Sequence, residues 1–420
     1  MHTVAGAAEE VEPARAMGPD MPLRKKQPKQ QLTKGMEHMR GYVTIEPTPP
    51  ATPPPPTSIT PTQFGEDAYG VPATYEPIRK PSTRPSEDNP EKRTDPFQFG
   101  TRYLQDSDDI FAHNAWDHVE VDPQYQEFIA QQSDFQRDNA VTEFDKRRFN
   151  EKPEKWWDKF YSNNQANFFK DRKWLVQEFP VLGAVTKEQY GSCRVLEVGA
   201  GAGNTAFPLL AMNRNRELRV HACDYSKKAI EVIRSQKVYI EQAEEGRVLQ
   251  ADVWDAAGDL LPPGLQPGTV DVILMIFIFS ALSPDQWQQC VKNIYDLLKP
   301  GGEVLFRDYG RGDLAQVRFK KGRYLEENFY VRGDGTRVYF FEEDELRDIW
   351  SGKAFGDEVR GLDVQNLAVD RRMLVNRQRK LKMYRCWMQG RFRKGGVSGR
   401  GEGVMGSEKE GVGSARSRDG

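Results

Sequence analysis

The stretch Val195–Thr205 reads V-L-E-V-G-A-G-A-G-N-T and lies in the middle of the 420-residue chain. A short apolar run that reads as a buried strand is followed by glycines at positions 199, 201 and 203. We expect Gly199 and Gly201 to let the backbone approach a ligand, and Gly203 to let the following helix pack closely. Because nicotinamide, flavin, nucleotide and S-adenosylmethionine proteins all use such a loop, the loop alone does not identify the ligand.

Short apolar runs alternate with amphipathic stretches after this loop. We expect strands at 194–198, 218–222, 247–250, 270–279, 302–307 and 382–389. We expect helices at 205–212, 227–241, 284–298 and 343–350. This alternation predicts right-handed βαβ crossovers and a parallel sheet with helices on both faces. The segment N-F-Y-V-R-G-D-G-T-R-V-Y-F-F, 328–341, reads as an antiparallel hairpin that closes the sheet.

Composition divides the chain into four parts. Residues 1–95 are Pro-rich and 395–420 are rich in Gly, Ser and charge, so both are expected to be disordered. Between them we expect a mainly helical segment, 96–185, that binds RNA and caps the cofactor, and a catalytic domain, 186–394. The four cysteines are scattered singly and no H-E-x-x-H occurs, so we expect no metal, no disulfide and a cytoplasmic location, with a nuclear or mitochondrial pool left open. No apolar run is long enough to span a membrane.

Carboxylates at the ends of the expected strands narrow the choice of ligand. Glu197 could reach a cationic amino group, and Asp224 could accept both ribose hydroxyls of a nucleoside. Asp252 could accept from the exocyclic amine of an adenine while Val253 packs on its ring. L-L-K-P-G-G-E-V-L-F, 297–306, is typical of the entry to a class I methyltransferase strand. Together these features predict a Rossmann-like class I methyltransferase with a mostly parallel seven-stranded sheet and S-adenosylmethionine as cofactor.

The methylated atom is inferred from what the chain lacks. No [DNS]-P-P-[YF] motif follows the fourth strand, which disfavours an exocyclic amine, and no Pro-Cys pair supplies a thiolate for carbon 5 of a pyrimidine. A ring nitrogen such as cytosine N3 needs neither device, because its lone pair can attack the sulfonium methyl in line. In R-D-Y-G-R-G-D-L-A-Q-V-R-F, 307–319, we expect Asp308 and Asp313 to accept from the base and Tyr309 to stack on it.

Basic residues are gathered in two places. From Arg371 to Lys394 there are ten Lys and Arg and no Asp or Glu. A second cluster beside aromatic residues consists of Arg318, Lys320, Lys321 and Arg323. Basic residues interleaved with aromatics suit a phosphate backbone with unstacked bases, although ordinary solvated strand and helix faces also carry such charge. The candidate phosphate contacts are Arg318, Lys320, Lys321, Arg371, Arg372 and Arg377.

Several longer motifs make the region 95–394 resemble the tRNA N3-methylcytidine methyltransferase family. They are F-G-T-R-Y-L (99–104), F-A-H-N-A-W-D-H-V-E (111–120), W-D-K-F-Y (157–161), N-F-F-K-D-R-K-W-L (167–175), 307–319 and V-D-R-R-M-L-V-N-R (369–377). The second motif, with His113, Asn114 and Trp116, resembles the branch that acts on threonine tRNA. The glycine loop carries Ala200 where the family usually has a cysteine.

The resemblance also implies roles for particular residues. Trp157 and Tyr161, one helical turn apart, would cover the cofactor. Phe169, Lys170 and Arg172 would belong to a substrate-side loop, and Asp308 matches a position implicated in activity. Cofactor contacts are implied at Gly199, Asp224, Asp252, Val253 and Ile276.

The activity that the resemblance implies is formation of 3-methylcytidine at position 32 of the tRNA anticodon loop. Threonine tRNA would be the substrate, with serine tRNA as a second candidate, and His113–Glu120 with the basic C-terminal stretch would clamp the anticodon stem by its phosphates. The base must be unpaired, because N3 lies on its Watson–Crick edge. The alternatives are a related methyltransferase acting on messenger RNA or protein, or a non-catalytic RNA-binding adaptor. Help from an aminoacyl-tRNA synthetase or another accessory protein is left open.

Overall fold

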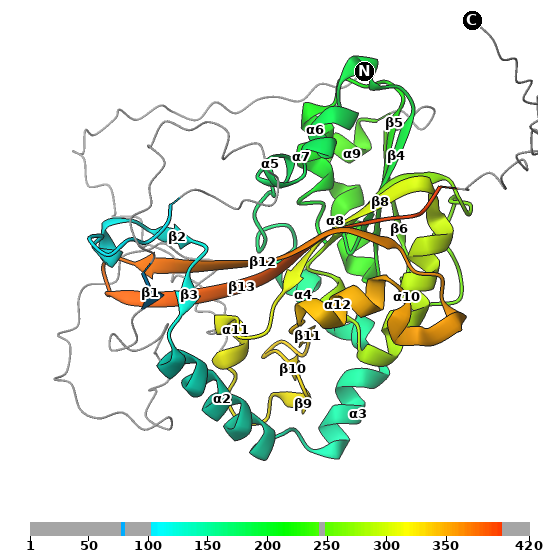
Figure 1. The fold of residues 1–420 in the computed structure, drawn as a ribbon. Coiled ribbons are helices and arrows are strands. Elements are labelled where there is room, and N and C mark those ends of the chain that lie inside the picture. Colours follow the sequence, from blue (N-terminus) through cyan, green and yellow to red (C-terminus); the bar gives the residue numbers. More distant parts are fainter. Residues whose placement is uncertain (1–76, 80–101, 243–247, 397–420) are drawn as a thin grey trace, which may run out of the picture.

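The computed structural model describes residues 77–79, 102–242 and 248–396 (Figure 1). The expectation of disorder in 1–95 and 395–420 concerns stretches that, apart from 77–79 and 395–396, lie outside the described residues. Within the described ranges, none of the helices combines the length and the apolar character that crossing a membrane requires.

A mixed eight-stranded sheet forms the centre of the described structure. Five of the eight strands run parallel to one another: β8, β7, β4, β5 and β6. The other three, β13, β12 and β2, continue the sheet with antiparallel pairing. In spatial order the strands are β2 (Ala115–Asp117), β12 (Asp363–Asn376), β13 (Leu381–Arg393), β8 (Leu298–Tyr309), β7 (Val270–Ile276), β4 (Cys193–Val198), β5 (Leu218–Asp224) and β6 (Leu249–Val253). The Rossmann-like class I fold with an antiparallel hairpin is thereby confirmed, and β2 adds one strand to the seven expected.

Helices cover both faces of the parallel strands. On one face pack α5 (Leu175–Glu178), α6 (Pro180–Val185), α7 (Ala206–Met212) and α8 (Lys227–Ser235), with α9 (Lys237–Ile240) after them. On the other face pack α10 (Pro284–Leu297) and α12 (Glu343–Trp350), together with the 3₁₀ helix η6 (Phe279–Ala281) that precedes α10. The apolar residues of the strands alternate between these two layers, so a buried core lies on each side of the sheet.

The segment before the expected catalytic domain is mainly helical. It contains α2 (Pro123–Asp138), α3 (Glu143–Glu151), α4 (Pro153–Asn164), η4 (Ile110–Ala112) and β3 (Glu120–Val121), and β3 pairs with β1 (Pro77–Ile78), which lies before the segment. The short η5 (Glu188–Tyr190) follows at the start of the catalytic domain. Three strands after β8 form a second, small sheet, and α11 and η7 complete the fold. These elements are α11 (Leu314–Val317), β9 (Tyr324–Glu326), β10 (Phe329–Val331), β11 (Arg337–Tyr339) and η7 (Lys353–Glu358).

Three expected elements differ from the structure. The hairpin at 328–341 forms as β10 and β11, but it pairs with β9 in the small sheet, and the hairpin that closes the main sheet is β12–β13. The helix expected at 227–241 is interrupted at Gln236, whose backbone is extended, with φ −69° and ψ 136°. The strand expected at 270–279 stops at Ile276, because Phe277 has a φ of 59° and cannot continue it.

Candidate active site

The glycine loop lies at the carboxyl end of β4, where it connects to α7. Gly199, Gly201 and Gly203 have φ values of 67°, 59° and 85°, a region in which other residues are strained. A Cβ at Gly199 would lie 2.5 Å from Ile278, and one at Gly201 would collide with the hydroxyl of Tyr161. The loop therefore requires glycine both for its backbone conformation and for the close approach of its neighbours.

Asp224, the last residue of β5, holds this loop in place. Its Oδ2 accepts a hydrogen bond from the backbone N–H of Gly201 at 2.8 Å, and its Oδ1 accepts from the N–H of Ser226 at 2.8 Å. Burial raises the pKa of Asp224 to about 6 although both hydrogen bonds oppose the shift. Each oxygen keeps a second lone pair, so the carboxylate can still accept from a pair of hydroxyl groups.

Glu197 lies inside the sheet directly before the loop and is almost fully buried. Its Oε2 accepts from the N–H of Ala206 at 3.1 Å, whereas Oε1 has no hydrogen-bond partner among the described residues. Arg172 approaches Oε1 to 3.6 Å, and burial still raises the pKa of Glu197 to about 7. A buried carboxylate oxygen without a hydrogen bond fits the cationic amino group expected at this position.

Helix α4 lies against the glycine loop and the start of α8. The rings of Trp157 and Tyr161 are stacked with centroids 6.2 Å apart, and Tyr161 is buried over Gly201. Asp158 secures the helix, because it accepts from Ser226 Oγ at 2.7 Å and from the N–H of Lys228 at 3.1 Å. No sequence motif had singled out Asp158 as a site residue, although its position three residues before Tyr161 places both on one helical face.

The other expected cofactor contacts differ in accessibility. Val253 is 38% exposed and pairs in register with Asp224, so it offers an apolar surface beside that carboxylate. Asp252 is already engaged, since it lies 2.8 Å from His221 Nε2 and 2.7 Å from Arg234. The side chain of Ile276 is buried in the core, which leaves only its backbone available at the strand end.

Asp308 and Tyr309 end β8 beside the loop that follows β7. Asp308 is fully buried, and its oxygens accept from the N–H groups of Ser280 and Tyr309 at 2.9 Å each. Burial raises the pKa of Asp308 to about 6. The half-buried ring of Tyr309 lies 5.0 Å from that of Phe277, a residue that no sequence signal had indicated. Asp308 thus fixes the backbone at this side of the candidate site, while the ring of Tyr309 is the aromatic surface on which a substrate base could stack.

Asp313 has a different environment from the one expected. It is fully buried and caps α11 through the N–H of Ala315 at 2.8 Å. Its Oδ2 accepts from Arg385 Nε and from the N–H of Cys386, both at 2.9 Å. These contacts favour a structural role, in which Asp313 joins α11 to β13, over contact with a substrate base.

The residues of the threonine-branch motif are only partly accessible. His113 and Asn114 are exposed, and the backbone carbonyl of Asn114 accepts from the N–H of Val375 in β12 at 2.8 Å. Trp116 is buried in a core under α2 and donates from Nε1 to the carbonyl of Ile110 at 2.8 Å. Trp116 therefore anchors the motif to the sheet and is closed to a base.

The residues of the expected substrate-side loop also differ in how far they are exposed. Lys170 is exposed, and Phe169 packs against Phe160 of α4 with ring centroids 5.7 Å apart. Arg172 turns inward, donating to Thr205 Oγ1 at 3.2 Å near Glu197. The structure thus places Arg172 with the glycine loop, on the cofactor side.

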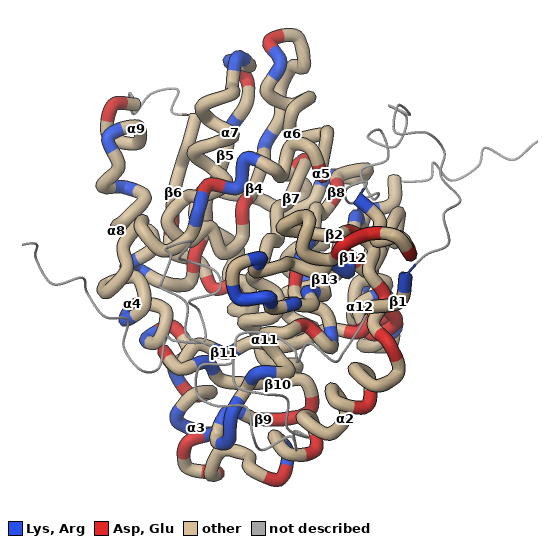
Figure 2. Tube along the Cα trace, turned by 90° about the vertical axis from the view of Figure 1, so that its left-hand side faces the viewer, with Lys and Arg blue, Asp and Glu red and all other residues tan. Residues whose placement is uncertain are grey.

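The basic residues do not form a single surface. Figure 2 shows Lys and Arg at the free end of hairpin β12–β13 and near the small sheet β9–β10–β11. Lys320, Lys321, Arg371 and Arg377 are exposed, and Arg318 is half-buried. Arg372 is held by three carboxylates, at 3.1 Å from Asp370, 3.5 Å from Asp117 and 3.6 Å from Glu178. The assignment of Arg372 to phosphate binding is therefore disfavoured.

Replacement of Arg372 by alanine is expected to destabilise the fold. Removing one partner of a buried ion pair costs about 3–5 kcal/mol, and the partial exposure of Arg372 reduces this to roughly 2 kcal/mol. Arg371→Ala, on the exposed face of the same strand, should change stability by less than about 0.5 kcal/mol. Urea unfolding of the two variants measures the difference, and equal stabilities would contradict the structural role of Arg372.

The geometry fits S-adenosylmethionine. The open oxygen of Glu197 suits its amino group, Asp224 its ribose hydroxyls and exposed Val253 its adenine, all at the carboxyl ends of parallel strands where such folds bind ligands. In the part of the chain that the structure describes, no group of three or more His, Cys, Asp or Glu side chains could hold a metal ion.

Comparisons with known proteins agree with this geometry. Residues 196–304 match a family model described as a methyltransferase domain. The chain is 48% identical over 299 residues to the tRNA(Thr) (cytosine(32)-N(3))-methyltransferase of Saccharomyces cerevisiae, covering 71% of this chain and 46% of that protein, about half its length. It is 47% identical over 296 residues to a tRNA N(3)-methylcytidine methyltransferase of Schizosaccharomyces pombe, covering 70% of this chain and 92% of that protein. A Burkholderia thailandensis 1,6-didemethyltoxoflavin-N1-methyltransferase structure with bound S-adenosylhomocysteine gives a TM-score of 0.36 at 15% identity, covering 58% of this chain and 87% of that one.

The sheet order and the carboxylates at its edge define an S-adenosylmethionine-dependent class I methyltransferase. The match to the S. pombe relative covers 70% of the chain, far more than the domain match at 196–304. The chain belongs to the tRNA N3-methylcytidine methyltransferase family.

Proposed function

We propose that this protein methylates N3 of cytosine 32 in the anticodon loop of tRNA, with threonine tRNA as substrate and serine tRNA as a second candidate. The observation that carries the proposal is the 47% identity to the S. pombe enzyme over 92% of that protein's length. The S. cerevisiae relative, whose name specifies tRNA(Thr) and cytosine 32, supports the position and the threonine preference.

The described residues suit an in-line displacement. When bound, the cofactor supplies an electrophilic methyl group on a sulfonium sulfur. Asp224 and Glu197 orient it from one side, and Tyr309 with Phe277 offers an aromatic surface for the cytosine at the end of β8. Transfer of that methyl group would use the N3 lone pair for the new N–C bond and leave the electron pair of the S–C bond on sulfur, so this chain would not have to supply a general base.

Cofactor affinity is expected to depend on pH through Glu197. Its pKa is about 7, so lowering the pH from about 8 to 6 protonates the carboxylate that pairs with the cationic amino group. Binding of S-adenosylhomocysteine should weaken about tenfold over this range. Calorimetry across the range measures the effect. Glu197→Gln should bind weakly throughout with little pH dependence, and an equally steep profile for this variant would exclude Glu197 as the titrating group.

The proposed activity is tested by incubating the protein with labelled cofactor and separated RNA classes. Label should enter tRNA and appear as 3-methylcytidine by nucleoside mass spectrometry. A threonine tRNA transcript with uridine at position 32 is the matched control and should take no label. Label in messenger RNA or protein would favour a related methyltransferase of different substrate, and failure to bind S-adenosylhomocysteine would favour an RNA-binding adaptor.

Two finer points belong to the same proposal. We propose a cytoplasmic location, supported by four cysteines that are all free and buried, and cell fractionation tests it.

An aminoacyl-tRNA synthetase or another accessory protein stays a candidate partner. The measurement is whether tRNA methylation by the purified protein accelerates when threonyl- or seryl-tRNA synthetase is added.

A further inference from the structure

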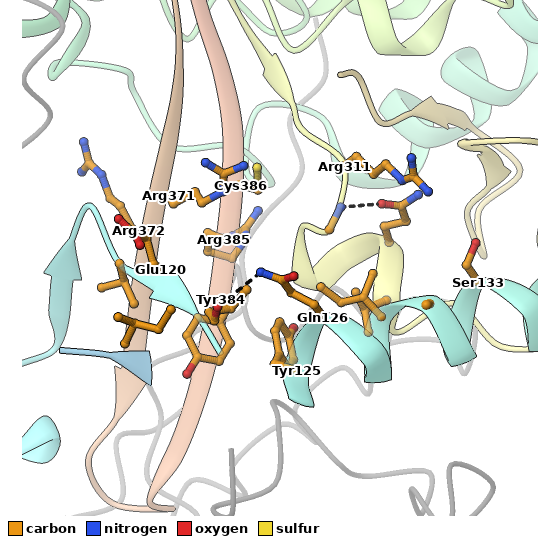
Figure 3. A pocket seen from close by; sticks show the side chains of 18 of the residues that line it. Glu120, Tyr125, Gln126, Ser133, Arg311, Arg371, Arg372, Tyr384, Arg385 and Cys386 are labelled. Atoms are coloured by element: carbon orange, nitrogen blue, oxygen red, sulfur yellow. Dashed lines mark hydrogen bonds between the residues drawn. The ribbon is translucent and has the colours of Figure 1, made fainter. Parts of the chain in front are cut away.

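A cavity of about 590 Å³, separate from the candidate cofactor contacts, lies between helix α2 and the hairpin β12–β13 (Figure 3). None of the expected cofactor contacts lines it. Its wall is largely apolar, and its volume is that of a site for a small ligand. The apolar lining includes Val119, Val121, Tyr125, Ile129 and Val317.

Guanidinium groups reach this cavity from two sides. Arg385 and Arg311 are each paired with an acid, Asp313 and Glu342 respectively. Arg371 is exposed and lies beside Cys386, its register partner in β13, and no described acidic side chain forms an ion pair with it. Figure 3 shows the side chain of Arg372 extending away from that of Arg371, as alternation along a strand requires. Arg371 is therefore the cation available to an anionic ligand.

The cavity adjoins the aromatic surface of the candidate active site through the backbone. Tyr309 pairs in register with Trp387, and the N–H of Gly310 donates to the carbonyl of Cys386 at 2.9 Å. Arg311 lies two residues after Tyr309, which is at most about 7 Å of chain. A polynucleotide that places one base at Tyr309 thus has a neighbouring residue within reach of the cavity.

We propose that this cavity binds a single unpaired nucleotide of the RNA substrate, adjacent to the methylated cytosine. Its base lies against the apolar wall formed by the partly exposed Val121 and Ile129, and its phosphate is bound by Arg371. Aromatic and apolar walls accept any base, and a guanidinium binds phosphate with two donors. The inference rests on the proposed function, because it takes the substrate to be RNA.

Two variants alter the cavity by different means. Ala130 is an exposed residue of α2 that lines the cavity, so Ala130→Trp fills the space without changing a charge. Its control is Gln131→Trp, at the next exposed position, which does not line it. Arg371→Ala removes the phosphate contact, and Arg360→Ala, exposed just before β12 and outside the basic stretch 371–394, is its control.

Binding of an anticodon stem-loop, measured by fluorescence anisotropy with S-adenosylhomocysteine present, should weaken about tenfold in Ala130→Trp and in Arg371→Ala. The controls should stay within about twofold of the parent, and Arg371→Ala should lower the salt dependence of binding by about one phosphate contact. Cofactor affinity and melting temperature should be unchanged in all four.

Stem-loops that lack one loop base at a time identify the occupant. In the parent protein, removal of one base next to cytosine 32 should weaken binding, and in Ala130→Trp the same removal should have no further effect. If removal of the base weakened binding equally in the parent and in Ala130→Trp, the inference would be wrong. It would also be wrong if the variants lost thermal stability but kept their RNA affinity, because the cavity would then serve only packing within the chain. If the parent methylates no tRNA the proposed function fails, whereas methylation with unchanged KM in both cavity variants refutes only this inference.

Discussion

Replacement of Asp224 by alanine is expected to abolish measurable binding of S-adenosylhomocysteine. The carboxylate accepts from Gly201 and Ser226, so the change removes the expected ribose contacts and the support of the glycine loop together. Hydrogen bonds to a charged acceptor contribute about 1.5–3 kcal/mol each, and the loss of two weakens binding on the order of 10²- to 10⁴-fold. Isothermal calorimetry measures the change.

Asp271→Ala is the matched control for this variant. Asp271 lies near the amino end of β7, at the end of the parallel strands opposite to the glycine loop. It forms an ion pair with Lys299 at 2.7 Å. Its replacement should leave the affinity for S-adenosylhomocysteine within about twofold of the parent, because exposed or half-exposed pairs contribute little. Tight binding by folded Asp224→Ala, checked by circular dichroism, would show that the nucleoside lies elsewhere.

Replacement of Asp308 by alanine is expected to lower kcat by about 10²-fold while cofactor affinity stays nearly unchanged. Asp308 fixes the backbone of Ser280 and Tyr309, the two segments between which the base is expected to lie. Without it those N–H groups lose their acceptor and the segments shift, and a displacement of about 1 Å can cost 10²-fold in rate.

The measurement for Asp308 is single-turnover methylation of threonine tRNA, with cofactor affinity determined in parallel. Asp308→Asn keeps one carbonyl oxygen as acceptor and should recover part of the rate, which distinguishes a positioning role from a need for negative charge. Equal losses in the two variants would indicate that the charge itself is required. A parent-like rate for Asp308→Ala would contradict any role in the active site.

Residues close together in the chain were the ones whose structure could be predicted. The glycine loop, the strands around it and the hairpin within 328–341 follow from local chemistry, because the spacing of apolar residues and the conformational freedom of glycine act over a few residues. Asp224 and Glu197 were selected for the same reason, since Asp224 is the last residue of its strand and Glu197 the next to last of its own. These predictions required no knowledge of distant contacts.

Buried charge was the main source of error. Asp313 and Arg372 read as available polar groups, yet each is held by partners far away in the sequence, in β13 and in β2 with α5 respectively. Arg307 shows the same principle: it lies between the rings of Trp174 and Trp387 and pairs with Asp370. The sequence around a charged residue does not reveal such partners, because the burial of a charged side chain depends on which distant segments pack around it.

The order of apolar and polar residues by itself determined the parallel sheet, the cofactor loop and the carboxylates that face it. Only the tertiary structure decided which hairpin completes the sheet, that Arg172 turns toward Glu197, and that a cavity opens between α2 and β12–β13. The physical reason is range. Strand and turn preferences act between neighbours along the chain, whereas pairing, burial and ion pairing act between surfaces that folding alone brings together.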